Sequence, residues 1–154
     1  MLVARVGAVG ASAVAEGLDF GVVERKVAVG GQLLTLRGIG GTYDEIFLPL
    51  HGAHQAQNAA VALAAVESFL GGGQGLLDVG LVRDGFAAVS SPGRLEVVRR
   101  SPTIIVDAGH NPDGMTVSLD AVREAFDFPR LVVVLGVLAD KDLAGMLDPP
   151  VRIA

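Results

Sequence analysis

The chain has 154 residues, of which 51% are hydrophobic and 19% charged, with a formal net charge of −5 and no cysteine. This composition excludes a disordered chain and favours an aliphatic α/β core. The basic residues are scattered and no apolar run reaches the roughly 18 residues of a membrane span, so we expect neither a nucleic-acid nor a membrane partner. The lack of cysteine excludes disulfides and thiol catalysis and is consistent with a cytoplasmic location.

The first 50 residues contain short apolar runs separated by turns rich in glycine. The runs lie at residues 27–29, 33–36 and 45–50, and the turns include Gly30 and the stretch 38–42. Apolar runs with this punctuation are typical of antiparallel β-hairpins.

Two helices are predicted in the next part of the chain. Residues 56–70 are apolar on nearly every side of a helix, which predicts that most of its surface is buried, and the glycines from Gly71 onward end it. A second helix is predicted over residues 77–89, where apolar residues form one stripe.

The Ser-Ser-Pro-Gly stretch at residues 90–93 interrupts the helical pattern, and we interpret it as a domain boundary. Strands are predicted at 94–99 and 103–107, then a helix that begins at Asn111-Pro112, then a strand at 131–135. This order predicts a βαβ unit with a parallel sheet. Two strands cannot bury the faces of such a sheet, so we expect the chain to stop inside a domain.

The loop between the strand ending at Asp107 and the following helix carries the most chemistry. Asp107, His110 and Asn111 place a carboxylate, an imidazole and an amide where open α/β sheets bind ligands. With the free N–H groups of a helix N-terminus, they could hold ribose hydroxyls, phosphate or a carboxylate. A solvated loop with a capping asparagine explains the same residues equally well.

A second group of polar residues precedes and opens the first predicted helix. His51 and His54 could bind a metal, but Gly52 between them and the lack of a third ligand make this improbable. Asn58 is interpreted first as a local helix cap. Its amide could instead be presented to a ligand such as an adenine edge.

Arg94 follows the proline-glycine turn, where a guanidinium could contact a phosphate with two hydrogen bonds. The simpler interpretation is a surface arginine paired with Glu96. The only lysines are Lys26 and Lys141, and neither lies in a P-loop motif, so these residues could not hold a triphosphate and magnesium unaided.

Four motifs, taken in chain order, indicate a resemblance to one particular family. They are Leu-His-Gly-Ala-His-Gln-Ala-Gln-Asn-Ala from Leu50, Ser-Pro-Gly-Arg-Leu-Glu from Ser91, Asp-Ala-Gly-His-Asn-Pro from Asp107 and Leu-Gly-Val-Leu-Ala-Asp-Lys-Asp from Leu135. Together they closely resemble the folylpolyglutamate synthase/dihydrofolate synthase family of the Mur-ligase superfamily. The resemblance covers residues 15–146 but only the middle of the family's length.

The resemblance implies an internal fragment of α/β fold. Residues 1–90 would be the C-terminal part of the central ATPase domain, and residues 91–154 the N-terminal part of a Rossmann-like, truncated C-terminal glutamate ligase domain. The family joins L-glutamate to a folate or dihydropteroate through an acyl phosphate made with ATP. The resemblance also implies Mg²⁺ as a cofactor, with its ligands outside this chain, and a monomeric parent enzyme.

The resemblance also implies residue roles. Asn58 would contact adenine, Arg94 the nucleotide phosphates and Asp107 the ribose, while His110 would face the substrate cleft as the candidate catalytic residue. The family more often has alanine where this chain has Gly109, which loosens the loop but keeps the side chains. The family's P-loop would lie upstream of this sequence, so we expect the chain alone to be inactive.

Two alternatives remain at this point. One is a different Mur-type ligase of cell-wall synthesis, from which the Asp-Ala-Gly-His-Asn-Pro motif separates this chain. The other is a non-catalytic nucleotide-binding or interaction module, which would bind ATP without turnover.

Overall fold

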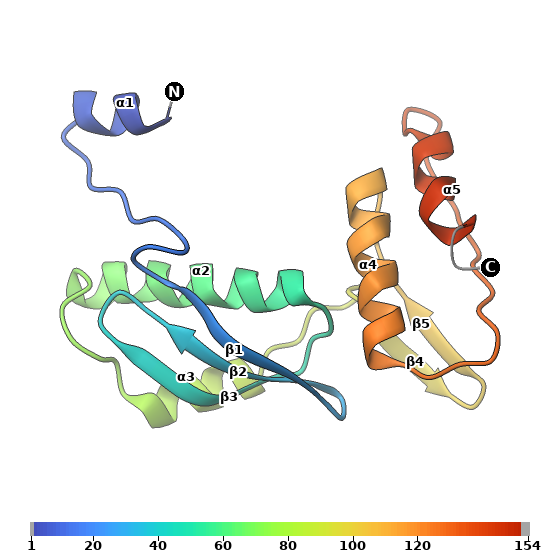
Figure 1. The fold of residues 1–154 in the computed structure, drawn as a ribbon, viewed down its shortest axis with the longest axis horizontal. Helices are drawn as coiled ribbons and strands as arrows, with labels where there is room; N and C mark the ends of the chain where they lie inside the picture. Colours follow the sequence, from blue (N-terminus) through green and yellow to red (C-terminus); the bar gives the residue numbers. More distant parts are fainter. Residues whose placement is uncertain (1, 152–154) are drawn as a thin grey trace.

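Two structural units, joined by the linker 88–95, make up the computed structural model, which describes residues 2–151 (Figure 1). A short helix, α1 (Leu2–Ala8), and an extended segment precede the first unit. No helix within residues 2–151 is both long and apolar enough to cross a membrane.

The first unit is built on a three-stranded antiparallel sheet. Its strands β1 (Gly21–Ala28), β2 (Gly31–Arg37) and β3 (Thr42–Leu48) lie in the order β1-β2-β3. The turn from β1 to β2 passes through Gly30, whose φ of 79° suits glycine. The predicted antiparallel hairpins are confirmed, and β1 begins earlier than its apolar run indicated.

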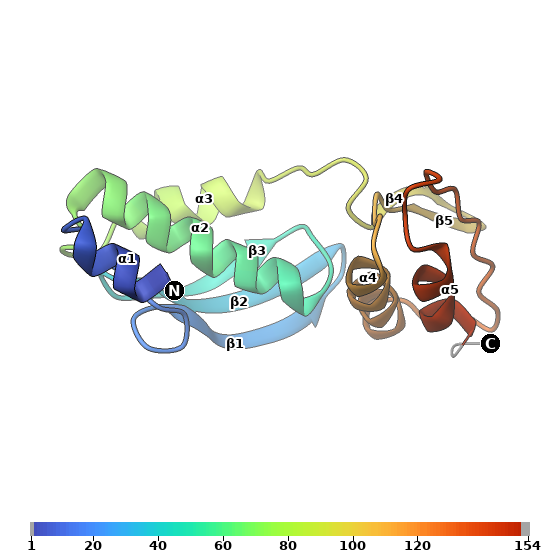
Figure 2. The same cartoon turned by 90° about the horizontal axis from the view of Figure 1, so that it is seen from above.

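Helices α2 (Ala53–Gly71) and α3 (Val79–Ala87) lie on the same side of this sheet (Figure 2). The core between them consists of buried side chains from β2, β3 and α2, among them Leu34, Leu36, Ile46, Ala60 and Leu63. Both helices lie where the sequence predicts them, within a few residues at each end.

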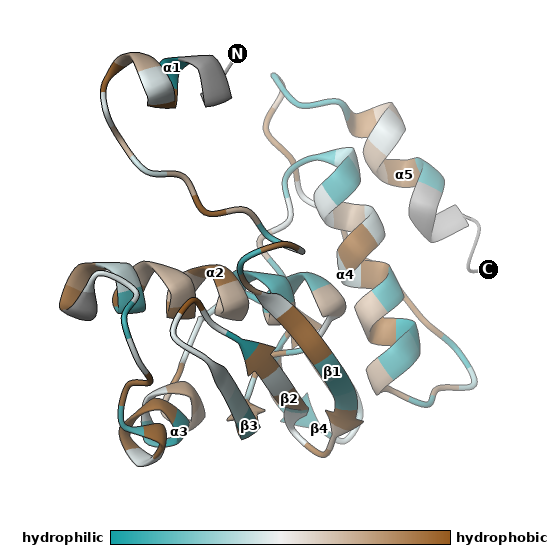
Figure 3. Ribbon diagram, turned by 60° about the vertical axis from the view of Figure 1, so that its left-hand side comes forward, coloured by the Kyte–Doolittle hydropathy of each residue, from teal (hydrophilic) through white to brown (hydrophobic). Residues whose placement is uncertain are grey.

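The prediction that the first helix is buried on most of its surface is wrong in this structure. Val61 is 49% exposed, Phe69 88% and Leu70 66%, so the face of α2 that turns away from the sheet is apolar and open. Figure 3 shows hydrophobic residues along α2 up to its C-terminal end. The physical reason is geometric, because one sheet face and α3 cover only one side of the helix.

A buried carboxylate joins α2 to the turn between β2 and β3. Glu67 is 1% exposed and accepts hydrogen bonds from the backbone N–H groups of Ile39 and Gly40 and from the Tyr43 hydroxyl. The Tyr43 oxygen in turn accepts a hydrogen bond from Leu77 N–H at 2.8 Å. A buried carboxylate with three donors satisfies the rule that buried charges must be hydrogen-bonded.

The second unit begins with the antiparallel pair β4 (Glu96–Arg100) and β5 (Thr103–Val106), followed by α4 (Pro112–Ala125) and α5 (Leu143–Val151). The strand predicted at 131–135 and its parallel pairing do not occur among the described residues. That segment does not pair with β5; instead its apolar side chains Leu131 and Leu135 pack against residues of α4.

Candidate functional site

The carboxylate of Asp107, directly after β5, organises the loop that leads into α4. Its Oδ2 accepts a hydrogen bond from Leu95 N–H at 3.0 Å, and its Oδ1 accepts from Gly109 N–H at 2.8 Å and from the Ser118 hydroxyl at 3.1 Å. An ionised carboxylate offers about four lone-pair positions, so roughly one remains for a ligand. Asp107 therefore holds the linker end, the loop and α4 together.

Helix α4 begins as its sequence predicts. The Asn111 side chain caps it by accepting from Gly114 N–H at 2.7 Å, Pro112 occupies the first turn and Asp113 adds a negative charge there. The His110 side chain is exposed just before this N-terminus, and its Nδ1 lies 3.2 Å from the Ala108 carbonyl oxygen. The imidazole is thus available to a ligand placed over the helix N-terminus.

Arg94 lies in the linker, close to the same loop. The Ala108 N–H donates to the Gly93 carbonyl at 2.7 Å, which holds the linker against the end of β5. Arg94 is exposed, and its predicted partner Glu96 instead accepts from Gly93 N–H at 2.9 Å. Within residues 2–151 no ion pair to Arg94 is formed, so its guanidinium is open to solvent.

Asn58 is not a helix cap, and the interpretation of it as a local cap is wrong. Helix α2 begins at Ala53 after Gly52, so Asn58 lies in the second turn, beyond the reach of a cap. Its exposed amide donates to Gln55 Oε1 at 3.3 Å.

His54 joins the two groups of candidate residues. It lies in the first turn of α2, and burial lowers its pKa, while the Asp107 carboxylate raises that pKa and the Arg94 guanidinium lowers it. These charges act on His54 because the start of α2 faces the loop after β5. The sequence makes a metal-binding role for His54 improbable and predicts no other role for it. Among residues 2–151 no group of three or more His, Cys, Asp or Glu side chains could hold a metal ion.

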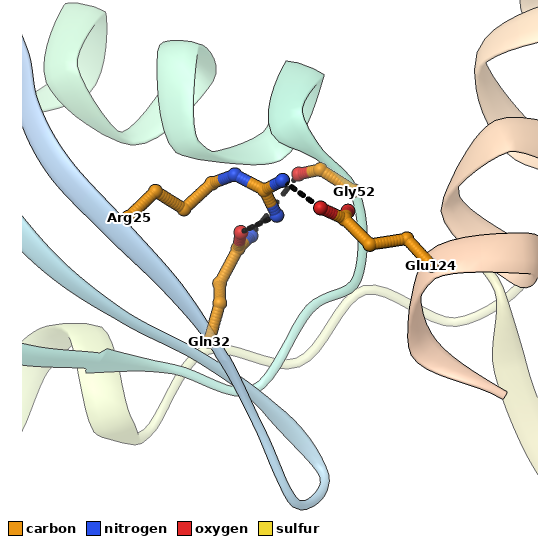
Figure 4. Close-up of polar contacts among 4 residues, drawn as sticks. All are labelled: Arg25, Gln32, Gly52 and Glu124. Carbon is orange, nitrogen blue, oxygen red and sulfur yellow. Dashed lines mark hydrogen bonds and ion pairs between the residues drawn. The ribbon is translucent and has the colours of Figure 1, made fainter.

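The contact between the two units was not foreseen from the sequence. The His51 ring lies against the Phe126 ring, with centroids 4.9 Å apart and planes inclined by 58°. Arg25 of β1 forms an ion pair with Glu124 of α4 (Figure 4). His51 lies in the motif that starts at Leu50, but Arg25, Glu124 and Phe126 belong to none of the four motifs, so only hydrophobic or charged character marked them.

A comparison with protein families finds a match in the second unit. Residues 93–149 match the family described as Mur ligase, glutamate ligase domain, and this segment contains Arg94, Asp107 and His110. This part of the chain is therefore similar to the glutamate ligase domain of Mur ligases.

The particular similarity is to folate enzymes. Over 138 residues the chain is 54% identical to dihydrofolate synthase/folylpolyglutamate synthase of Mycobacterium tuberculosis, covering 89% of this chain and 28% of that protein. A structure of M. tuberculosis folylpolyglutamate synthase complexed with ADP matches with a TM-score of 0.90 and 51% identity, covering 95% of this chain and 32% of the other. The resemblance to folylpolyglutamate synthase and the predicted α/β, Mur-ligase-type fold are confirmed.

A cell-wall enzyme is also similar. UDP-N-acetylmuramyl-tripeptide synthetase of Leifsonia xyli is 38% identical over 111 residues, covering 70% of this chain and 21% of that protein. The chain thus spans less than a third of the length of each of these relatives.

Proposed function

We propose that this chain is part of an ATP-dependent ligase that adds L-glutamate to tetrahydrofolate or to dihydropteroate. The observation that carries the proposal is the 54% identity to dihydrofolate synthase/folylpolyglutamate synthase across both units. In this reaction the folate carboxylate takes the γ-phosphoryl group of ATP and releases ADP. The amine of glutamate then attacks the acyl phosphate, and phosphate leaves as the amide bond forms.

The proposed nucleotide site extends across the linker. Asn58 on α2 would contact adenine through its exposed amide, Arg94 would neutralise phosphate charge, and Asp107 would accept from a ribose hydroxyl with its remaining lone pair. His110 would face the acyl acceptor from its exposed position before α4. The charges of Asp107 and Arg94 both influence the pKa of His54 on α2, which supports one site built from both units.

The assignment of ATP is supported by the ADP complex of the M. tuberculosis enzyme. Magnesium would neutralise the phosphates during transfer. We propose that the magnesium ligands lie outside this chain, as in the family it resembles; among the described residues no group of three or more His, Cys, Asp or Glu side chains could hold a metal ion. We also propose a monomeric, cytoplasmic parent enzyme.

We propose the domain boundary at residues 90 and 91. The linker 88–95 and the match to the glutamate ligase domain from residue 93 onward support this position. Residues 1–90 would then belong to the central ATPase domain and residues 91–154 to the C-terminal domain.

The test compares two arginines in the full-length ligase that contains this chain. Arg94→Ala removes a charge-assisted phosphate contact, so kcat/KM for ATP should fall by roughly 10- to 150-fold. Arg99→Ala, the matched control, removes an exposed arginine of β4 with no assigned role and should have little effect. Equal and mild effects of both substitutions would show that Arg94 is only a surface residue.

The similarity to the L. xyli enzyme keeps a cell-wall Mur ligase as a second candidate. A substrate panel separates the two. We expect ATP-dependent incorporation of glutamate into dihydropteroate or tetrahydrofolate, and none of an amino acid into a UDP-linked muramyl peptide. ATP binding without turnover on any acceptor would instead indicate a non-catalytic module.

A further inference from the structure

An ion pair between residues 99 positions apart joins the two units of the described chain. Arg25 of β1 reaches Glu124 near the C-terminal end of α4, and the two side chains are 20% and 39% exposed (Figure 4). The ion pairs Lys26–Glu24, Arg83–Asp44, Arg83–Glu45, Arg123–Asp120 and Lys141–Asp140 each lie within one unit. This pair therefore acts on the position of one unit against the other.

A second contact, within the first unit, holds the Arg25 side chain in position. Gln32 of β2 is 1% exposed; its Oε1 accepts from the Arg25 guanidinium at 3.2 Å, and its Nε2 donates to the Gly52 carbonyl at 3.1 Å. Gly52 directly precedes α2. One network thus connects the hairpin of β1 and β2, the start of α2 and the far end of α4.

Close packing surrounds this network. A Cβ atom added at Gly52 would lie 2.9 Å from the Ala121 Cβ, so α4 approaches the backbone there more closely than a side chain would allow. Five residues further along the chain, directly after α4, Phe126 packs against the His51 ring. We call this contact, made by Arg25, Gln32 and residues 51–52 with Ala121, Glu124 and Phe126, the hairpin–α4 clamp.

The position of the clamp allows it to restrain rotation of the second unit relative to the first. The linker joins the second unit beside the Asp107 loop, where Ala108 N–H bonds Gly93, so a pivot lies near the proposed nucleotide site. Glu124 is twelve residues beyond Pro112 in α4, which is about 18 Å along the helix axis. A contact at that distance from the pivot resists rotation far better than one beside it.

We propose that Arg25 and Glu124 are positioning residues of the ligase, which hold Arg94 and Asp107 opposite Asn58. This inference rests on the proposed function. The clamp connects the start of α2, which carries Asn58, to α4, whose Ser118 is bonded to Asp107. The match of both units to an ADP complex with a TM-score of 0.90 supports the clamped arrangement as one that admits nucleotide.

The first measurement is kinetic and uses the full-length ligase. Arg25→Glu and Glu124→Arg each place like charges together, and we expect KM for ATP to rise by about 3- to 10-fold while kcat changes less than about twofold. The double variant Arg25→Glu/Glu124→Arg recreates an ion pair with reversed charges and should restore KM. Arg83→Glu is the matched control, because Arg83 pairs with Asp44 and Glu45 inside the first unit.

The second measurement does not depend on ligase activity. The chain has no cysteine, so Val61→Cys on α2 and Val98→Cys on β4, both about half exposed, can carry spin labels without other changes. The distance distribution between the labels should broaden in each single reversal and narrow again in the double variant. High salt should broaden it in the unchanged chain, because the pair is partly exposed.

Several outcomes overturn the inference. The inference fails if the single charge reversals leave both KM for ATP and the distance distribution as in the Arg83→Glu control. It also fails if the double variant restores neither quantity. If the full-length protein shows no ligase activity, the proposed function fails while the distances still decide the clamp. If the labelled chain does not fold, the kinetic arm decides it.

Discussion

Replacing Tyr43 with phenylalanine removes a single oxygen atom from the most buried polar cluster of the first unit. Tyr43 is 0% exposed; its hydroxyl donates to Glu67 at 2.8 Å and accepts from Leu77 N–H at 2.8 Å. Phenylalanine fills nearly the same space, so the loss is one of hydrogen bonding.

The magnitude follows from the two bonds. A hydrogen bond to a charged group contributes about 1.5–3 kcal/mol, and a partly buried N–H left without a partner costs about 1 kcal/mol. We therefore expect Tyr43→Phe to lower the free energy of unfolding by about 2.5–4 kcal/mol. In a chain of this length that corresponds to a fall in Tm of roughly 5–15 °C.

The assay is urea and thermal unfolding followed by far-ultraviolet circular dichroism, since Tyr43 is the only tyrosine and there is no tryptophan. Glu24→Gln is the control, because its ion pair with Lys26 is exposed and should contribute less than about 1 kcal/mol. The double variant Tyr43→Phe/Glu67→Gln should lose less than the sum of the single losses, because the two side chains share a bond. A Tyr43→Phe loss no larger than that of Glu24→Gln would refute the reasoning.

Two further predictions concern pH and association. Burial lowers the pKa of His51 from 6.5, so the folded chain resists a proton that the unfolded chain accepts; stability should be full above pH 6.5 and fall as the pH drops below it. Melts at about pH 7.5 and about pH 5.5 should show this loss, and His51→Phe should reduce it; an equal loss in both proteins would contradict the assignment. Phe69→Ser/Leu70→Ser removes two apolar side chains that are 88% and 66% exposed, so self-association of the chain should decrease in light scattering. Ser68→Ala, directly before them in the sequence, is the control, and equal scattering from all three proteins would argue against this face.

Local chemistry in the sequence determined much of the first unit and the start of the second. The hairpins, both helices and the cap of α4 at Asn111 follow from signals within a few residues, such as turn glycines, helical periodicity and an Asn-Pro pair. The motifs around Arg94 and Asp107 likewise predicted the similarity to Mur ligases. Each of these features depends on neighbours along the chain.

Tertiary packing decided two features that the sequence pattern did not predict correctly, the conformation of residues 131–135 and the position of Asn58 in α2. The run at 131–135 has the composition of a strand, but a strand also needs a paired neighbour, and here the run packs on α4 instead. Asn58 lies outside the cap position because α2 starts a turn earlier, at Ala53. Tertiary contacts at Gly52 account for this shift of about one turn in the start of α2.

The relation between the two halves of the proposed site came only from the tertiary structure. Arg25 and Glu124 are 99 residues apart, and neither has a local feature that predicts the other. His54 acquires Asp107 and Arg94 as electrostatic neighbours only because α4 docks on the start of α2. Sequence periodicity reports which face of an element is apolar, whereas the choice of partner across a linker depends on shape and on paired charges that meet only in the folded chain.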